Sequence, residues 1–167
     1  MLIRSEQESD WPAVHAVNVA AFGRPDEADL VDAVRVECHP IVSLIAEEND
    51  KIVGHILFSP IRLSDHSDAM IMGLGPLAVL PASQRQGFGA ALAFAGLERC
   101  RELGAGAAIV LGHPSYYPRF GFKASTCFGI RPAFDVPKEA FMAMELLPGY
   151  LDNRSGVAHY HPVFDGV

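Results

Sequence analysis

The chain has 167 residues, of which 50% are apolar and 20% are charged, and its formal net charge is −7 at pH 7. This length and composition are typical of one globular domain, so we expect a single domain over residues 1–167. The acidic balance argues against nucleic acid as a partner, because binding to phosphate backbones requires a basic surface. The longest apolar run, around Ala90–Gly96, is far shorter than a membrane span, so we expect no membrane partner.

Cys38, Cys100 and Cys127 are widely spaced and form no CxxC pair. They predict neither a zinc site nor a disulfide framework, and we expect no bound metal. The N-terminus lacks the basic and apolar segments of a signal peptide. Together these features predict a reducing, cytoplasmic location.

The first half of the chain alternates between helical and strand patterns. Ser9 or Asp10 is predicted to cap a first helix that ends near Gly23, and Pro25-Asp26 to begin a second. The remaining patterns predict strands near residues 2–3, at Val42–Ala46 and Ile52–Ile61 as a hairpin, and at Met70–Leu80.

The most informative stretch follows the third of these long strands. After Leu77-Ala-Val-Leu-Pro, the loop Gln84-Arg-Gln-Gly-Phe-Gly89 opens directly into an alanine-rich helix. Glycines allow a ligand to approach the backbone, and the N–H groups at a helix start carry the positive end of the helix dipole. The loop therefore predicts a site for a phosphorylated cofactor.

The rest of the chain completes an α+β pattern. The helix is predicted over Phe88–Leu103 with Gly104 as its C-terminal cap, followed by a buried parallel strand at Ala107–Leu111. The tail contains two further strand candidates, Phe141–Leu146 and Val157–Phe164.

Two nucleotide-binding motifs fit this loop poorly. A dinucleotide-binding unit carries three glycines as GxGxxG, and Gly87-Phe-Gly89-Ala-Ala-Leu lacks the third. A P-loop requires Gly-Lys-Ser/Thr, which occurs nowhere in the chain. A dinucleotide enzyme of another fold nevertheless remains one of three hypotheses, and comparing CoA with NAD binding would separate it from the others.

The loop resembles the Q/R-x-x-G-x-G/A signature of the GNAT acyltransferase superfamily. Downstream, Tyr117-Pro-Arg-Phe-Gly-Phe122 resembles the Y-x-x-x-G-F element of the same family, and the order of elements agrees across nearly the whole chain. The longer string from His113 to Phe122 is similar to a bacterial subgroup of predicted N-acetyltransferases.

The resemblance implies a GNAT-like fold. We expect a mixed, mainly antiparallel sheet of about six to seven strands, flanked by helices and splayed between its central strands. It also implies acetyl-CoA as the donor, with CoA as product and direct transfer to a primary amine. The residues expected to bind this cofactor are those of the preceding strand and the loop, namely Leu77, Ala78, Val79, Arg85, Gln86, Gly87, Phe88, Gly89 and Ala90.

Acyl transfer from a thioester requires a proton for the departing thiolate. Tyr117 matches the general acid of the family, and a phenol with a pKa near 10 stays protonated at neutral pH. Pro114 and Pro118 stand where typical members have an uninterrupted helix, so Tyr116 remains an alternative acid.

The general base is not assigned by the sequence. The candidates are Glu47, Glu48, His66 and His113, each of which is more typical of a solvated or structural residue. His159 and His161 would share one strand face, and without a third ligand nearby they are interpreted as surface residues.

The acceptor is expected to be a small-molecule or protein amine. The resemblance places its pocket near Phe22–Leu30, Phe141 and Phe164. The carboxylates Asp26, Glu27 and Asp29 in that neighbourhood favour a small cationic amine. A non-catalytic acyl-CoA-binding module is the alternative function, and a homodimer is a further possibility.

Overall fold

The computed structural model describes residues 1–167 and consists of three α-helices, nine strands and several short 3-10 helices. The helices are α1 (Trp11–Phe22), α2 (Asp26–Glu37) and α3 (Phe88–Leu103). The strands are β1 (Leu2–Ser5), β2 (Val42–Glu48), β3 (Lys51–Leu63), β4 (Ile71–Val79), β5 (Ala107–Leu111), β6 (Lys123–Ala124), β7 (Ile130–Pro132), β8 (Phe141–Glu145) and β9 (Gly156–His159).

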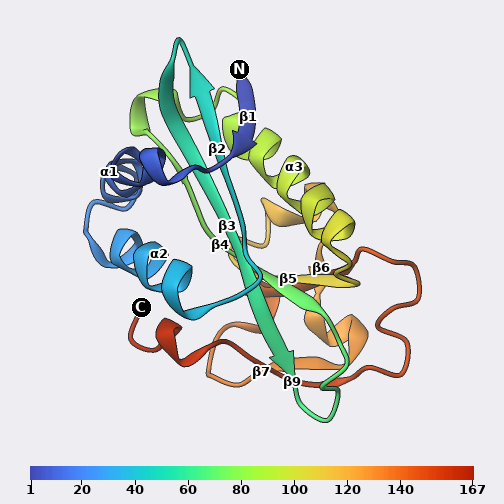
Figure 1. Cartoon of the computed structure of the whole chain (residues 1–167). Helices are drawn as coiled ribbons and strands as arrows, with labels where there is room; N and C mark the ends of the chain where they lie inside the picture. The colour runs from blue at the N-terminus through green and yellow to red at the C-terminus, as the bar shows by residue number, and fades with distance from the viewer.

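The first four strands form an antiparallel meander covered on both faces by helices. Strands β1 to β4 pair with one another in sequence order. Helices α1 and α2 cover one face of this meander and α3 lies on the other (Figure 1). The predicted helix Phe88–Leu103 and the hairpin are confirmed, and Gly104 caps α3 with a φ of 102°. The fold is the expected mixed, mostly antiparallel sheet flanked by helices.

The N-terminus of α1 differs from the prediction. Asp10 stands at the cap position, but its carboxylate makes no capping bond to the helix. Instead it accepts hydrogen bonds from both Nη atoms of Arg4, at 2.7 and 3.0 Å, and from the Gln7 N–H. A charged, bidentate partner on β1 is a stronger acceptor interaction than a helix N–H, so Asp10 ties α1 to the edge strand.

The centre of the sheet contains the one parallel pairing of the main sheet, and it is short. Strand β4 pairs with β5 only from Ile71 to Leu74. Beyond that point Gly75 and Pro76 produce a register irregularity in β4, which continues to pair with β3. Proline has no N–H to donate to a ladder. The two strands therefore lose contact at the point where the expected splay begins.

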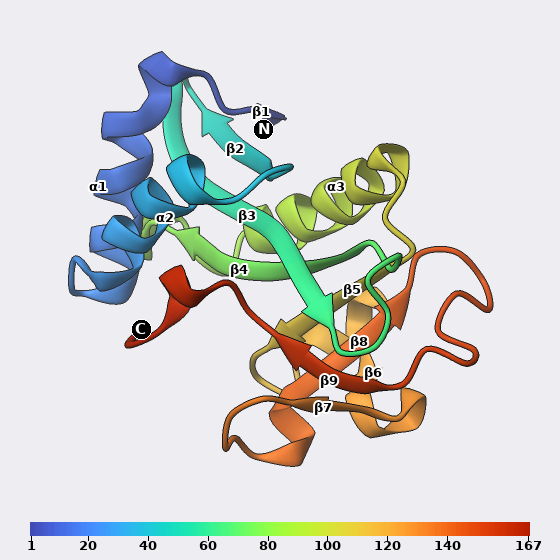
Figure 2. The ribbon, with the colours of Figure 1, turned by 60° about the horizontal axis from the view of Figure 1, so that its bottom comes forward.

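The C-terminal part contains more strands than the sequence predicted. Strand β8 pairs with β5 on one side and with the two-residue β6 on the other, while β9 pairs with the end of β3 and with β7. The predicted strand Val157–Phe164 is wrong beyond His159, because Pro162 begins a 3-10 helix. Figure 2 shows this last segment running from β9 back toward α2.

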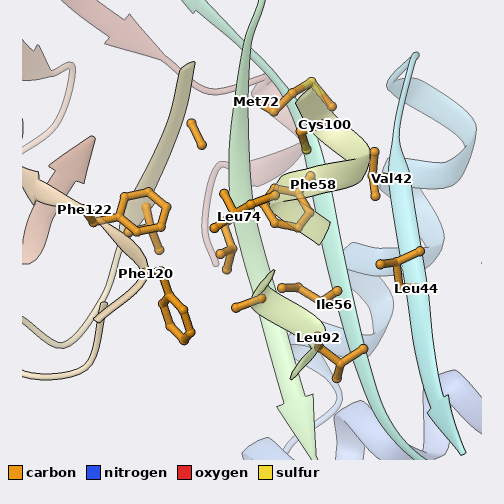
Figure 3. Close-up of a cluster of buried hydrophobic side chains, with 14 of the residues drawn as sticks. Val42, Leu44, Ile56, Phe58, Met72, Leu74, Leu92, Cys100, Phe120 and Phe122 are labelled. Carbon is orange, nitrogen blue, oxygen red and sulfur yellow. The ribbon is translucent and has the colours of Figure 1, made fainter. Parts of the chain in front are cut away.

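The core on the α3 face reaches from the meander into the second half of the chain. Leu92 and Cys100 of α3 pack with Phe58 and Leu74 of the sheet, and Phe120 and Phe122 lie beside Leu74 (Figure 3). Burial raises the pKa of the Cys100 thiol to about 12, in agreement with the predicted packing role. No helix has the length and apolar character needed to cross a membrane.

Candidate active site

The free edge of β4 is the first part of the site. The Leu80 N–H donates to Val53 of β3 at 2.8 Å, and residues two apart in an antiparallel ladder face the same neighbour. The backbone groups of Ala78 therefore face β3, and those of Leu77 and Val79 face the edge from which β5 has diverged. The Gln84 side chain donates to the Val79 carbonyl there, at 3.1 Å.

The loop between β4 and α3 presents a row of unpaired donors. The first hydrogen bond of α3 joins the Ala91 N–H to the Gly87 carbonyl at 3.0 Å. The six backbone N–H groups from Arg85 to Ala90 have no acceptor in the protein. Both Arg85 (φ 63°) and Gly87 (φ 91°) are left-handed, and such alternation turns successive N–H groups into an anion-binding concavity.

The structure requires glycine at the two glycine positions of the loop for different reasons. Gly87 occupies a left-handed conformation that favours glycine, although a Cβ there would meet nothing within 4 Å. Gly89 has ordinary backbone angles, but its Cβ would lie 3.0 Å from the hydroxyl of Tyr116. Gly89 thus allows the tyrosine loop to approach the first turn of α3, a contact that the sequence did not reveal.

Tyr117 begins a four-residue 3-10 helix, Tyr117–Phe120. Typical members of the family that the sequence resembles have a longer, uninterrupted helix at this position. Its ring lies against Gly112, where a Cβ would be 2.3 Å from Cε2. The ring also packs edge-on against Phe122. Burial raises the pKa of the Tyr117 phenol to about 12. This tyrosine is therefore a firmly held, protonated donor.

A cavity of about 710 Å³ opens beside Tyr117, where β4 and β5 separate. Its walls come from the α1–α2 junction, the β4 irregularity, the end of β5 and the C-terminal segment. The lining residues are Phe22, Arg24, Glu27, Leu30, Leu74, Gly75, Pro76, Leu77, Leu111, Tyr117, Ala133, Phe134, Tyr160, Phe164, Asp165, Gly166 and Val167. Tyr116 lies outside this lining.

The predicted acceptor neighbourhood is correct in part. Glu27 and Phe164 line the cavity, whereas Asp26 and Asp29 do not, and Phe141 is buried in the core on β8, the neighbour of β5. Hydrogen bonds from Arg24 lower the pKa of the Glu27 carboxyl. The sequence missed Phe134 and Tyr160, which reach the cavity from loops and strand ends that carry no local motif.

None of the proposed general bases lines the cavity. Glu47 is held by Arg4 at 2.6 Å, and His113 Nδ1 lies 2.7 Å from the Ser115 hydroxyl. His161 accepts a hydrogen bond from the Val163 N–H and caps the last 3-10 helix, so the expected shared strand face with His159 is not formed. Glu27 and Asp165 are the side-chain carboxylates of the cavity.

A buried histidine joins the layers behind the site. His55 of β3 is paired in register with Ala78 and is fully buried. Its Nδ1 lies 3.2 Å from the Asn18 amide of α1, and its Nε2 lies 2.9 Å from the Ser43 hydroxyl of β2. Burial lowers the pKa of His55 to about 3, so the ring is neutral.

The fold and the site define a class. A sheet that opens beside a free strand edge, an anion-binding helix start and a protonated tyrosine at an acceptor-sized cavity together indicate an acyltransferase. The family model described as "Acetyltransferase (GNAT) domain" matches residues 2–125. The chain belongs to the GNAT family of acetyltransferases.

Two relatives from Escherichia coli K12 are similar in sequence. The chain is 31% identical to the uncharacterized N-acetyltransferase YhbS over 166 residues, which cover 99% of each chain. It is 39% identical to the uncharacterized N-acetyltransferase YjhQ over 138 residues, 79% of this chain and 75% of YjhQ.

Two solved structures share the fold over almost the whole chain. The crystal structure of Escherichia coli YhbS in complex with CoA superposes with a TM-score of 0.92 at 30% identity, covering 98% of this chain and 91% of that one. A GNAT family acetyltransferase from Brucella melitensis in complex with acetyl-CoA gives a TM-score of 0.80 at 35% identity, covering 98% and 97%.

Proposed function

We propose that this acetyltransferase uses acetyl-CoA and transfers the acetyl group directly to a primary amine in the cavity beside Tyr117. The observation that carries the proposal is the row of six N–H groups without acceptors, Arg85 to Ala90, at the start of α3. The relatives whose structures contain CoA and acetyl-CoA support the same donor. Acetyl-CoA supplies an activated acetyl thioester.

The loop and β4 residues fit the two chemical parts of this donor. A diphosphate requires several N–H donors in a small concavity, which the backbone of Arg85, Gln86, Gly87, Phe88, Gly89 and Ala90 provides. A pantetheine arm contains amides that pair with a free strand edge. The backbone groups of Leu77 and Val79 offer that edge, with Ala78 fixed to β3 between them.

Tyr117 is proposed as the general acid in preference to Tyr116. Its ring lines the cavity, while the Tyr116 hydroxyl lies over Gly89 at the cofactor loop. The raised pKa of Tyr117, about 12, keeps the phenol protonated at neutral pH, so that it has a proton to donate toward the sulfur of the departing thiolate.

The acceptor is proposed to be an amine that carries a cation and an apolar body. Aromatic walls from Phe22, Phe134 and Phe164 would cover the apolar part, and Glu27 and Asp165 would attract the positive charge. Arg24 offsets part of the charge of Glu27. The unpaired carboxylate of Asp165 is therefore the stronger of the two attractions.

We further propose that residues 1–167 form one acyltransferase domain, since β1 to β9 belong to one connected set of strands and the YhbS structure covers 98% of the chain. The homodimer and the cytoplasmic location stay predictions.

A thiol-release assay with acetyl-CoA tests the proposal across a panel of amines. The panel contains aliphatic diamines, arylalkyl amines, amino acids and a peptide with a free N-terminus. Release of CoA with a cationic, partly apolar amine, and little with amino acids, is the expected result. Tight acetyl-CoA binding without turnover on any member would favour the alternative of a non-catalytic binding module.

A further inference from the structure

The two adjacent tyrosines of the loop face different parts of the site. Tyr117 lines the acceptor cavity, whereas the hydroxyl of Tyr116 lies 3.0 Å from the position of a Gly89 Cβ. Gly89 is in the first turn of α3, between two of the unpaired N–H groups of the cofactor loop. The Tyr116 hydroxyl itself makes no hydrogen bond within the protein, so it is a further free donor beside that row.

Arg119 is fixed against the same tyrosine. Its Cζ lies 4.3 Å from the centroid of the Tyr116 ring, and its Nε donates to the Tyr116 carbonyl at 2.7 Å. These two contacts hold the planar guanidinium in one orientation and leave both Nη groups free. A pre-oriented guanidinium with free Nη donors is well suited to a phosphate group.

The charge of Arg119 is not neutralised by the protein. The chain has 20 acidic and 13 basic residues, and five arginines form ion pairs with carboxylates, namely Arg4, Arg24, Arg35, Arg101 and Arg154. Arg119 is exposed and has no carboxylate within 4.0 Å. Arg119 therefore carries a charge that is oriented by its contacts with Tyr116 and free to bind an anionic ligand.

We infer that Tyr116 and Arg119 form a side-chain arm of the cofactor site that binds the diphosphate group beside the first turn of α3. This inference rests on the proposed use of acetyl-CoA and adds two binding residues that the backbone cradle does not include. It also gives Gly89 a reason to be glycine, because any side chain there would displace the Tyr116 hydroxyl. The two adjacent tyrosines thus have different roles: Tyr116 binds the cofactor, and Tyr117 acts as the general acid.

The test is titration calorimetry of CoA and of ADP, a probe that carries the diphosphate without the pantetheine arm. The variants are Tyr116→Phe and Arg119→Gln, with thermal melting to confirm folding. A hydrogen bond to a charged group is lost in each, so we expect each variant to bind both CoA and ADP about tenfold more weakly.

Two controls separate this role from general effects. Arg62→Gln removes the same charge from an exposed, unpaired arginine at the far end of β3 and should leave both affinities unchanged. Tyr117→Phe removes the neighbouring hydroxyl, which faces the acceptor cavity, and should leave the ADP affinity unchanged. Equal affinities in wild type, Tyr116→Phe and Arg119→Gln would overturn the inference while leaving the proposed function intact. A wild type that binds no CoA would overturn both.

Discussion

The proposed cofactor side and the proposed acceptor side of this protein are built in opposite ways. The cofactor side is made mainly by backbone atoms of one continuous stretch, from Leu77 to Ala90, to which the inferred arm adds the side chains of Tyr116 and Arg119. The acceptor side is made by side chains from five separate segments, from Phe22 at the end of α1 to Val167. Tyr117 lies where the two meet.

This difference has consequences for how each side tolerates change. Backbone donors survive most substitutions, because only the conformation of the chain must be kept. A cavity wall made of side chains changes its shape and charge with every substitution. We therefore expect the cofactor side to tolerate most substitutions and the acceptor side to set the substrate specificity. The following substitutions test this contrast.

The largest effect is expected for Tyr117→Phe. This change keeps the packed ring and removes the proton, so kcat should fall by about 10²–10⁴-fold, the usual range for loss of a general acid. CoA affinity should stay the same, because the cofactor side is untouched. Steady-state thiol release together with calorimetry measures both quantities, and an unchanged kcat would remove Tyr117 from the chemistry.

Gly112→Ala tests whether the position of Tyr117 matters as much as its proton. The new Cβ would lie 2.3 Å from Cε2 of the ring, so the ring must move. A displacement of about 1 Å at a catalytic group lowers the rate by about 10²-fold. We expect this loss in kcat with CoA affinity unchanged. A parallel loss of CoA affinity would show that the two sides are coupled through this loop.

His55 lies behind both sides, and its pKa predicts how stability depends on pH. The ring titrates near 6.5 when unfolded and at about 3 when folded, so the unfolded state binds more protons between these values. The contribution of the neutral His55 ring to the free energy of unfolding is fully present above pH 6.5. It decreases as the pH falls, by about 2 kcal/mol at pH 5. Urea unfolding between pH 5 and 7.5 measures it, and His55→Gln should flatten this dependence.

Gly87→Ala perturbs the cofactor side by conformation alone. A left-handed alanine costs about 1–2 kcal/mol, and relief of that strain would rotate the N–H groups away from their concavity. We expect CoA to bind about fivefold to tenfold more weakly, with the amine KM unchanged. Gly104→Ala is the matched control, because it has a similar φ and open space at the other end of α3. Equal CoA affinity in both variants would contradict the proposed binding of the diphosphate by the backbone N–H groups from Arg85 to Ala90.

Glu27→Gln is expected to have the smallest effect and to act on the acceptor alone. Arg24 already offsets part of its charge, so the KM for a cationic amine should rise only about threefold, as is usual for partly compensated charges. Asp29→Asn changes the charge of the same helix outside the cavity and serves as the control. An identical KM in both variants would leave cation recognition to Asp165 or to the aromatic walls.

Much of the fold could be predicted from local patterns. The helix Phe88–Leu103, the β2–β3 hairpin and the loop before α3 all appear where their periodicity and glycines placed them. The short strands β6 and β7 could not be predicted, because two or three residues carry no periodicity. Asp10 stands at the predicted cap position, but its carboxylate binds Arg4, six residues earlier, and makes no capping bond to the helix.

The sequence by itself predicted the glycine loop before α3 and the family. Helix starts, glycine conformations and the order of elements depend on interactions between near neighbours, and these leave a readable pattern. The tertiary structure alone decided the cavity, the contact between Tyr116 and Gly89, and which carboxylates face the acceptor. Those features depend on side chains far apart in the chain that meet only when the sheet opens between β4 and β5. Local propensity and residue spacing do not predict such contacts, because they form between residues far apart in the chain and only when the protein packs.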